Sequence, residues 1–316
     1  MPSSDFGRLP FLRGVGVLLA APFPLPAQPA PRPEPPPLHM PAGATAHRDL
    51  AYVRDGHARQ KLDLFLPEKS TGPIPLVIWV HGGGWQNGSK DQCLPLRLGF
   101  TARGYAVASL NYRLSGHAVF PAQIEDCQAA VRWLRDHAND YGLDPERFAV
   151  WGASAGGHLV ALLGTAGDSA EFAPTPPPKT SARVQAVCDF YGPTDLLKFA
   201  QTPGYLGHAR ADSPESKLLG GPVLDRPAQA KRANPITYVG PGDPPFLIIH
   251  GSADPVVPPQ QSTLLHAALQ AAGLPSTHRT IADAKHGGPE FSTPAVADEV
   301  DAFFRRSLGL PPAAKR

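Results

Sequence analysis

Phe148-Ala-Val-Trp-Gly-Ala-Ser-Ala-Gly-Gly-His-Leu-Val-Ala-Leu-Leu163 decides the fold of this chain. An apolar run leads into Gly152-Ala-Ser-Ala-Gly156, and a run rich in Ala and Leu follows, which predicts a buried strand, a sharp turn and a helix. Such a turn strains the backbone, and the two outer glycines avoid the collisions that a Cβ would make with the neighbouring strand or helix. The pattern places Ser154 at the apex of the turn, and the amide of Ala155 at the start of the new helix.

A second glycine-rich segment follows another buried strand pattern. The apolar run 75–80 ends in His81-Gly-Gly-Gly-Trp85. Glycine amides are not screened by side chains and can approach a ligand oxygen closely. Gly83 and Gly84, together with Ala155, are therefore the candidate donors to an oxyanion, with the amide of Trp85 as an alternative. His81 is expected to hold the shape of the loop by hydrogen bonding and to take no proton.

An acid and a base follow two later strand patterns. Asp254 comes just after the apolar run 245–250, in a turn stiffened by prolines, which suits a carboxylate that orients an imidazole. His286 lies in a glycine-flanked loop after the run 277–281. The chain order serine, acid, histidine is the order of the α/β-hydrolase fold. The weaker rivals are Asp189, Asp195 and Asp283 among the acids, and His158, His250, His266 and His278 among the histidines, whose positions in strands or helices favour packing.

Strand and helix patterns alternate along the chain, which predicts a mostly parallel sheet flanked by helices. The segments 51–54 and 61–66 flank Asp55-Gly56 and predict an antiparallel hairpin at one edge of the sheet. In parallel sheets, sites lie beyond the carboxyl ends of the strands, where every candidate above falls. The segment 196–239 breaks into short pieces rich in proline and glycine, and is expected to cover part of the site on the substrate side.

The first forty residues differ in composition from the rest. Arg8 and Arg13 precede an apolar run at 15–23 and small residues near Ala27, as in a secretory signal peptide, so we expect residues 1–27 to direct export to the periplasm or medium. The alternative is a disordered cytoplasmic tail. Residues 28–44 form a proline-rich linker, and residues 45–310 the folded domain. The apolar run is too short to cross a bilayer of about 30 Å, so no membrane span is expected.

Composition narrows the class of protein. The 316 residues, 42% of them hydrophobic and 18% charged, can form one large α/β domain. A net charge of +2 without a basic run argues against a nucleic-acid partner. Three cysteines show no metal-ligand spacing. Either Cys93 pairs with Cys127 in a disulfide, because Cys188 lies in a strand pattern, or all three are buried thiols.

These segments together resemble a known family. His81-Gly-Gly-Gly-Trp85, Trp151-Gly-Ala-Ser-Ala-Gly-Gly-His158, His250-Gly-Ser-Ala-Asp254 and His286-Gly are similar to the α/β-hydrolase esterases related to hormone-sensitive lipase and to the BD-FAE-like carbohydrate esterases. The resemblance runs from about Ala51 to Leu308. Ala153 stands where the relatives of hormone-sensitive lipase commonly carry Asp, which favours the second group.

The resemblance implies acyl transfer in two steps, with Ser154 as nucleophile, His286 as base and Asp254 as its ionised partner, and with no metal or organic cofactor. It also implies a small ester or an acylated carbohydrate as substrate, carrying short acyl or feruloyl groups, with Trp85 and Tyr191 as substrate contacts. A polyester-cleaving esterase, a prolyl-oligopeptidase-like peptidase and an inactive binding module are the alternatives. No feature of the sequence sets the oligomeric state.

Overall fold

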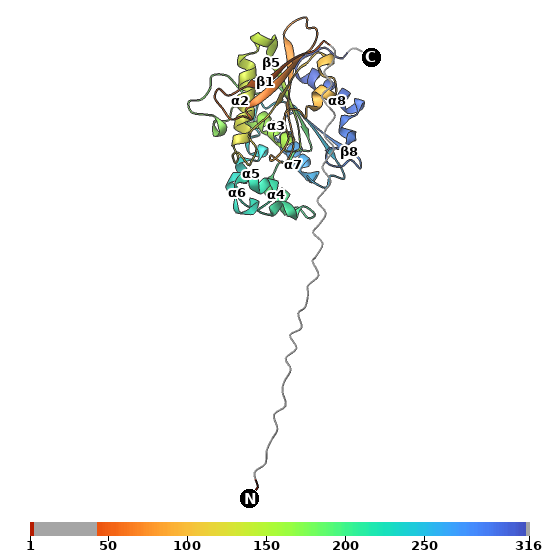
Figure 1. Cartoon of the computed structure of the whole chain (residues 1–316). Coiled ribbons are helices and arrows are strands. Elements are labelled where there is room, and N and C mark those ends of the chain that lie inside the picture. The colour runs from red at the N-terminus through yellow and green to blue at the C-terminus, as the bar shows by residue number, and fades with distance from the viewer. Residues whose placement is uncertain (3–42, 314–316) are drawn as a thin grey trace. The chain divides into compact units, whose positions relative to one another are not determined.

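A computed structural model describes residues 1–2 and 43–313. Within 43–313, eight strands form one sheet in the order β1-β2-β4-β3-β5-β6-β7-β8 (Figure 1). β2 pairs antiparallel with β1 and β4, and all other pairs are parallel, which confirms the predicted mostly parallel sheet with an antiparallel edge. The strands are β1 (Thr45–Ala51), β2 (Lys61–Leu66), β3 (Ile74–Val80), β4 (Ala106–Leu110), β5 (Leu143–Ala153), β6 (Ala186–Phe190), β7 (Phe246–Gly251) and β8 (Ser276–Ile281).

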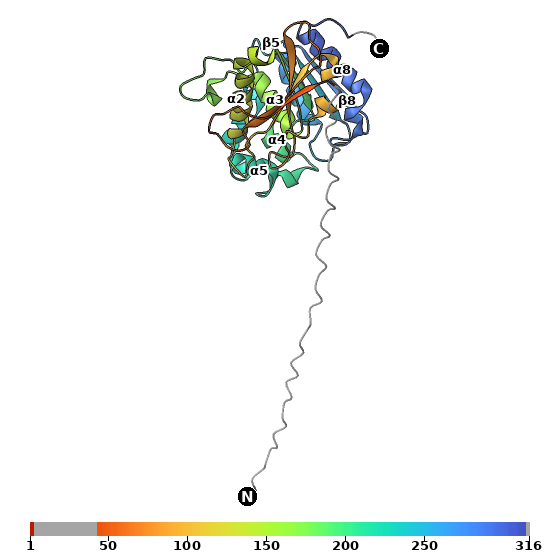
Figure 2. The same ribbon diagram turned by 45° about the horizontal axis from the view of Figure 1, so that its top comes forward.

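Helices cover both faces of the sheet. Side chains alternate along each strand, so Leu76, Ile78 and Val80 of β3 face one core layer while Val77 and Trp79 face the other. The first layer includes α2, α3 and α7, and the second includes α1 and α8. α2 and α8 lie on opposite sides of the strands (Figure 2). The helices are α1 (Leu94–Arg97), α2 (Ala122–Asp136), α3 (Ala155–Ala166), α4 (Leu196–Gln201), α5 (Pro214–Leu219), α6 (Pro227–Arg232), α7 (Gln260–Ala271) and α8 (Pro294–Ser307).

Two predicted strand boundaries are wrong. The first strand of the hairpin covers Thr45–Ala51 and not 51–54, because the chain turns around Asp55, whose φ is +53°. The Tyr52 amide closes this loop by donating a hydrogen bond to the Gln60 carbonyl (3.2 Å). The strand before the serine turn also begins earlier than the apolar run at Phe148. Residues 144–147 belong to β5, which starts at Leu143 opposite Ile74.

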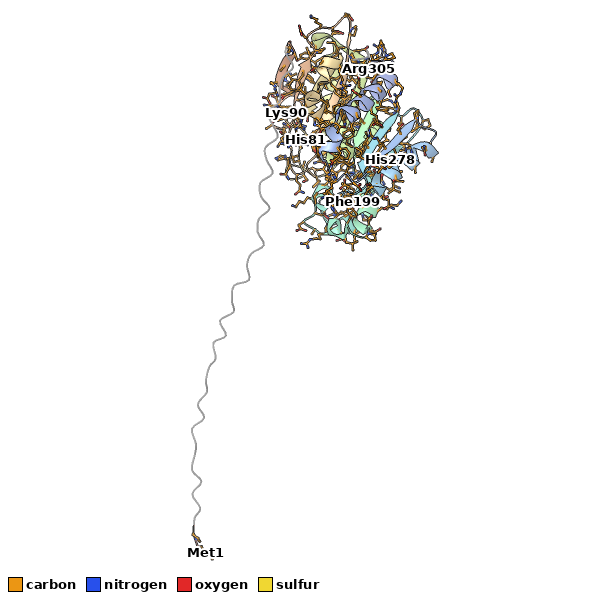
Figure 3. The ribbon with its side chains drawn as sticks, turned by 90° about the vertical axis from the view of Figure 1, so that its right-hand side faces the viewer. Met1, His81, Lys90, Phe199, His278 and Arg305 are labelled. Carbon is orange, nitrogen blue, oxygen red and sulfur yellow. The ribbon has the colours of Figure 1, made fainter. Side chains whose placement is uncertain are left out.

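The segment 196–239, called the cover segment below, contains α4, α5 and α6, which gather at one end of the sheet (Figure 1). Phe199 of α4 lies at the opposite end of the domain from Arg305 of α8 (Figure 3). The cover segment contributes buried apolar side chains to the first core layer. It also binds the loops around the site: the Tyr205 hydroxyl donates to the Asp254 carbonyl, and Lys217 Nζ donates to Gln86 Oε1 (2.9 Å).

All three cysteines are buried free thiols, so the second alternative is confirmed and the Cys93–Cys127 disulfide is wrong. Cys127 of α2 belongs to the first core layer, whereas Cys93, just before α1, belongs to the second. The sheet therefore separates the two thiols. Residues 3–42, which include nearly all of the predicted signal peptide and linker, lie outside the described residues. Among the described residues, we find no helix with the length and hydropathy of a membrane span.

Candidate active site

Ser154 occupies the strained turn between β5 and α3. Its φ of 56° and ψ of −123° are unusual for a residue with a side chain. A Cβ on Gly152 would overlap the Gly156 carbonyl, and a Cβ on Gly156 would overlap the Val80 carbonyl of the neighbouring strand. The turn therefore requires glycine on both sides of the serine, as the sequence predicted.

The structure brings the three predicted residues into one chain of hydrogen bonds. His286 Nε2 lies 2.8 Å from Ser154 Oγ, and His286 Nδ1 lies 2.7 Å from Asp254 Oδ2. The serine follows β5, the acid follows β7 and the histidine follows β8. Because these strands end at the same edge of the sheet, residues more than 100 positions apart meet there.

The surroundings of Asp254 keep its carboxylate ionised. Asp254 Oδ1 accepts hydrogen bonds from the amides of Val256 (2.8 Å) and Val257 (2.9 Å). Burial alone would raise the pKa of Asp254, but hydrogen bonds from His250, His286 and the Val257 amide outweigh it, and the pKa lies well below its usual value. An ionised acid can hold His286 with its hydrogen on Nδ1, which leaves Nε2 free to accept a proton from Ser154.

The glycine loop after β3 lies against the serine turn. A Cβ on Gly82 would come within 2.7 Å of the Ala153 carbonyl and 3.3 Å of the Ser154 Cβ. Gly83 and Gly84 have φ of 107° and 58°, and their amides donate no hydrogen bond to any residue in 43–313. Ala155 is the first residue of α3, whose leading amides have no acceptor within the helix. All three predicted oxyanion donors thus have amides without an acceptor among residues 43–313, and Gly82 places the glycine loop against the serine turn.

Arg59, between β1 and β2, ties this loop to the sheet and was missed by the sequence analysis. Its guanidinium donates to the carbonyls of Tyr112 (2.8 Å) and Gly88 (2.9 Å) and to His81 Nε2 (3.1 Å). His81 Nδ1 in turn donates to the Gly82 carbonyl (2.7 Å), and burial lowers the pKa of His81 to about 3. His81 is therefore a neutral, structural histidine, as expected. No local pattern marks Arg59, because its partners are distant in sequence.

The two aromatic residues predicted to contact substrate are placed differently. The Trp85 side chain is buried in the first core layer, 1% exposed, and packs edge-on against His158 at 5.3 Å. Its ring thus lies beneath the loop rather than on a surface that a substrate could reach. Tyr191, 7% exposed, packs edge-on against His286 at 4.7 Å, and its φ of 43° is strained. The Tyr191 ring therefore lies next to His286 in the site, unlike the Trp85 ring.

The rival residues have other partners. Asp195 caps α4 through the Lys198 amide (3.0 Å), and Asp189 accepts from the Gly192 amide (2.9 Å). His158 donates to the Ala233 carbonyl (2.6 Å). His250, assigned to packing by its strand position, instead lies 3.2 Å from Asp254 Oδ2. No group of three or more His, Cys, Asp or Glu side chains in the described part of the chain is arranged to hold a metal ion.

Comparisons with known proteins find related sequences. The sequence profile of the BD-FAE family matches residues 62–269. The esterase LipQ of Mycobacterium tuberculosis is 32% identical over 244 residues, which cover 74% of this chain and 57% of LipQ. This chain thus spans little more than half the length of that relative.

Two solved structures are also similar. A truncated carbohydrate esterase from gut microbiota superposes with a TM-score of 0.75 at 29% identity, covering 84% of this chain and 96% of that protein. An acetyl ester-xyloside bifunctional hydrolase from Caldicellulosiruptor lactoaceticus superposes with a TM-score of 0.67 at 26% identity, covering 79% and 90%. The fold and the site define an α/β-hydrolase. Within that class, the chain belongs to the BD-FAE family.

Proposed function

We propose that this protein is a carboxylic ester hydrolase that cleaves short acyl or feruloyl esters of plant carbohydrate through an acyl-enzyme on Ser154. The hydrogen-bond chain from Ser154 through His286 to Asp254 is the observation that carries the proposal. Esterases among the relatives support the reaction class, and the carbohydrate esterase and the acetyl ester-xyloside hydrolase support the substrate class.

In the proposed reaction, His286 Nε2 accepts the proton of Ser154 as Oγ attacks the ester carbonyl. The amides of Gly83, Gly84 and Ala155 stabilise the oxyanion of the tetrahedral intermediate. His286 then gives its proton to the departing alcohol, and the acyl group remains on Ser154. Water attacks the acyl-enzyme by the same steps, releases the acid and restores the serine. Asp254 stays ionised and holds the imidazole.

Hydrolysis of a series of esters tests this proposal. We expect activity on p-nitrophenyl acetate to exceed that on the butyrate and octanoate esters, and acetate or ferulate to be released from acetylated xylan or methyl ferulate. The Ser154→Ala variant is the control for each substrate. A wild-type protein that hydrolyses none of these esters would overturn the proposal, and activity on p-nitrophenyl esters alone would restrict it to the reaction class.

We also propose that residues 1–27 direct export and that residues 28–44 link the signal to the domain, which would bring the enzyme to polymeric carbohydrate outside the cell. This part rests on the sequence pattern. N-terminal sequencing of the protein from periplasm and medium tests it: a mature chain that begins near residue 28 is expected, and an intact Met1 in the cytoplasm would contradict it.

A further inference from the structure

Two imidazoles lie close to one oxygen of the Asp254 carboxylate. His286 Nδ1 lies 2.7 Å from Oδ2, and His250 Nε2 lies 3.2 Å from the same oxygen. The amides of Val256 and Val257 occupy the other oxygen, Oδ1. The acid is 2% exposed, so water does not replace any of these donors readily. His250 therefore supplies the one side-chain donor to Asp254 besides His286 among residues 43–313.

The hydrogen bonds of His250 define its tautomer. Nε2 faces two acceptors, the Asp254 carboxylate and the Val257 carbonyl (3.1 Å), so it carries a hydrogen. Nδ1 lies 2.7 Å from the hydroxyl of Ser262, which can donate to it. His250 and Ser262 are both fully buried. Ser262, in the first turn of α7, thus favours the tautomer that directs an N–H at Asp254.

We propose that His250, with its tautomer set by Ser262, is a positioning residue for the acid of the triad. It holds the carboxylate so that Oδ2 faces His286 Nδ1, and it contacts no substrate. Polar contacts of 2.7 to 3.2 Å then connect Ser154, His286, Asp254, His250 and Ser262. This inference rests on the proposed function, because the alignment matters only if His286 acts as a base.

Packing alone does not account for this imidazole. An apolar side chain would fill the same space between β7 and α7 without needing partners for two polar nitrogen atoms. Both nitrogens of His250 are instead paired, and two of its three partners, Asp254 and the Val257 carbonyl, belong to the acid turn. Without the His250 donor, the two amides still hold Oδ1, but His286 is the one side chain left on Oδ2, so the direction of the carboxylate toward His286 is set less firmly.

Three variants test the inference: His250→Leu removes the donor, His250→Gln keeps an amide N–H of similar reach, and Ser262→Ala removes the group that sets the tautomer. His278→Leu is the matched control, because it removes an imidazole from the neighbouring strand β8. Each full-length variant is measured for melting temperature, for kcat and KM on p-nitrophenyl acetate, and for the downfield ¹H NMR signal of the hydrogen between His286 and Asp254. This signal reports the geometry of that hydrogen bond directly.

We expect His250→Leu to lower kcat by ~10- to 100-fold with KM within about twofold, as for a small misplacement of a reacting group. The downfield signal should shift or disappear. His250→Gln should recover most of kcat and the signal, Ser262→Ala should lie between the two, and His278→Leu should match the wild type. If His250→Leu does not fold, the kcat and the NMR signal of Ser262→Ala, compared with those of His278→Leu, test the inference.

Wild-type kcat and an unmoved NMR signal in a folded His250→Leu or Ser262→Ala variant would overturn the inference, as would equal losses in His250→Leu and His250→Gln. Failure of the proposed function has a different result, since a wild-type protein without esterase activity gives no kcat to compare. The NMR signal still tests the positioning of Asp254 in that case.

Discussion

The guanidinium of Arg59 lies 3.1 Å from Nε2 of His81 and joins the connection between β1 and β2 to the glycine loop beside Ser154. Arg59 also binds the carbonyl of Gly88, at the far end of that loop. The amides of Gly83 and Gly84 can serve an oxyanion only if the loop keeps this shape. The antiparallel edge of the sheet, remote from the triad in sequence, thus supports the predicted oxyanion site.

We predict that Arg59→Met lowers kcat by ~10- to 100-fold, less than the ~100- to 1000-fold typical when a donor is removed outright, because the amides remain but are held less firmly. KM should change little. Arg54→Met is the control, since Arg54 lies in the same connection with a side chain that is 96% exposed. Steady-state kinetics on p-nitrophenyl acetate check both variants, and equal kcat values for the two would contradict the role given to Arg59.

Gly156→Ala should destabilise the fold severely. In an ordinary helix this change stabilises by up to about 1 kcal/mol, but here the new Cβ would overlap the Val80 carbonyl, and overpacking typically costs about 1–3 kcal/mol and occasionally more. Urea denaturation measures the loss. Gly72→Ala, whose Cβ would meet nothing within 4 Å, should leave stability unchanged. Similar unfolding midpoints for the two variants would contradict this prediction, because they would mean that the turn accommodates a Cβ at position 156.

We predict that the free energy of unfolding depends on pH because of Asp189. Burial raises its pKa to about 6, and Oδ2 has no hydrogen-bond partner among the described residues. The folded state therefore binds the proton more tightly than the unfolded state, so the ionised side chain destabilises the fold fully above about pH 6 and not below about pH 4. Asp189→Asn should stabilise the protein by up to about 3 kcal/mol at pH 7.5.

The same substitution should have little effect at pH 4, where Asp189 is protonated in both states. Thermal unfolding of the wild type and the Asn variant at the two pH values checks this. A stability difference that does not change with pH would show that Asp189 does not titrate in this range.

Because all three cysteines are buried free thiols, we predict that a thiol reagent labels them only after the protein unfolds. Ellman's reagent should react with none of the cysteines in the native protein and with three per chain after unfolding without reductant. Reductant should not change the melting temperature. A single reactive thiol after unfolding, together with a lower melting temperature in reductant, would instead demonstrate a disulfide.

The local patterns of the sequence were sufficient to predict the serine turn, the glycine loop and the edge of the sheet where Asp254 and His286 follow their strands. Each depends on a backbone requirement, such as the glycines around Ser154, that appears in adjacent residues. The direction of a side chain in the folded protein is not local. Arg59 meets His81 across the fold, Trp85 turns inward against His158, and the sheet separates Cys93 from Cys127.

The contacts of His250 also could not be predicted from the local sequence. Its place in an apolar strand correctly indicates burial, and it is 0% exposed. Its position four residues before Asp254 gives no sign that the chain turns back at the strand end and brings the acid to its ring. Only the three-dimensional arrangement reveals that this buried imidazole serves the site.

The identity of the nucleophile is the central claim, and covalent labelling tests it most directly. The wild type and Ser154→Ala are incubated with a p-nitrophenyl phosphonate, which transfers its phosphonyl group to an activated serine, and the modified peptide is mapped by mass spectrometry. We predict one adduct, on Ser154, formed as esterase activity is lost, and none in the variant, whose activity should fall by several orders of magnitude. An adduct on another residue, or a Ser154→Ala variant that keeps its activity, would contradict the proposed mechanism.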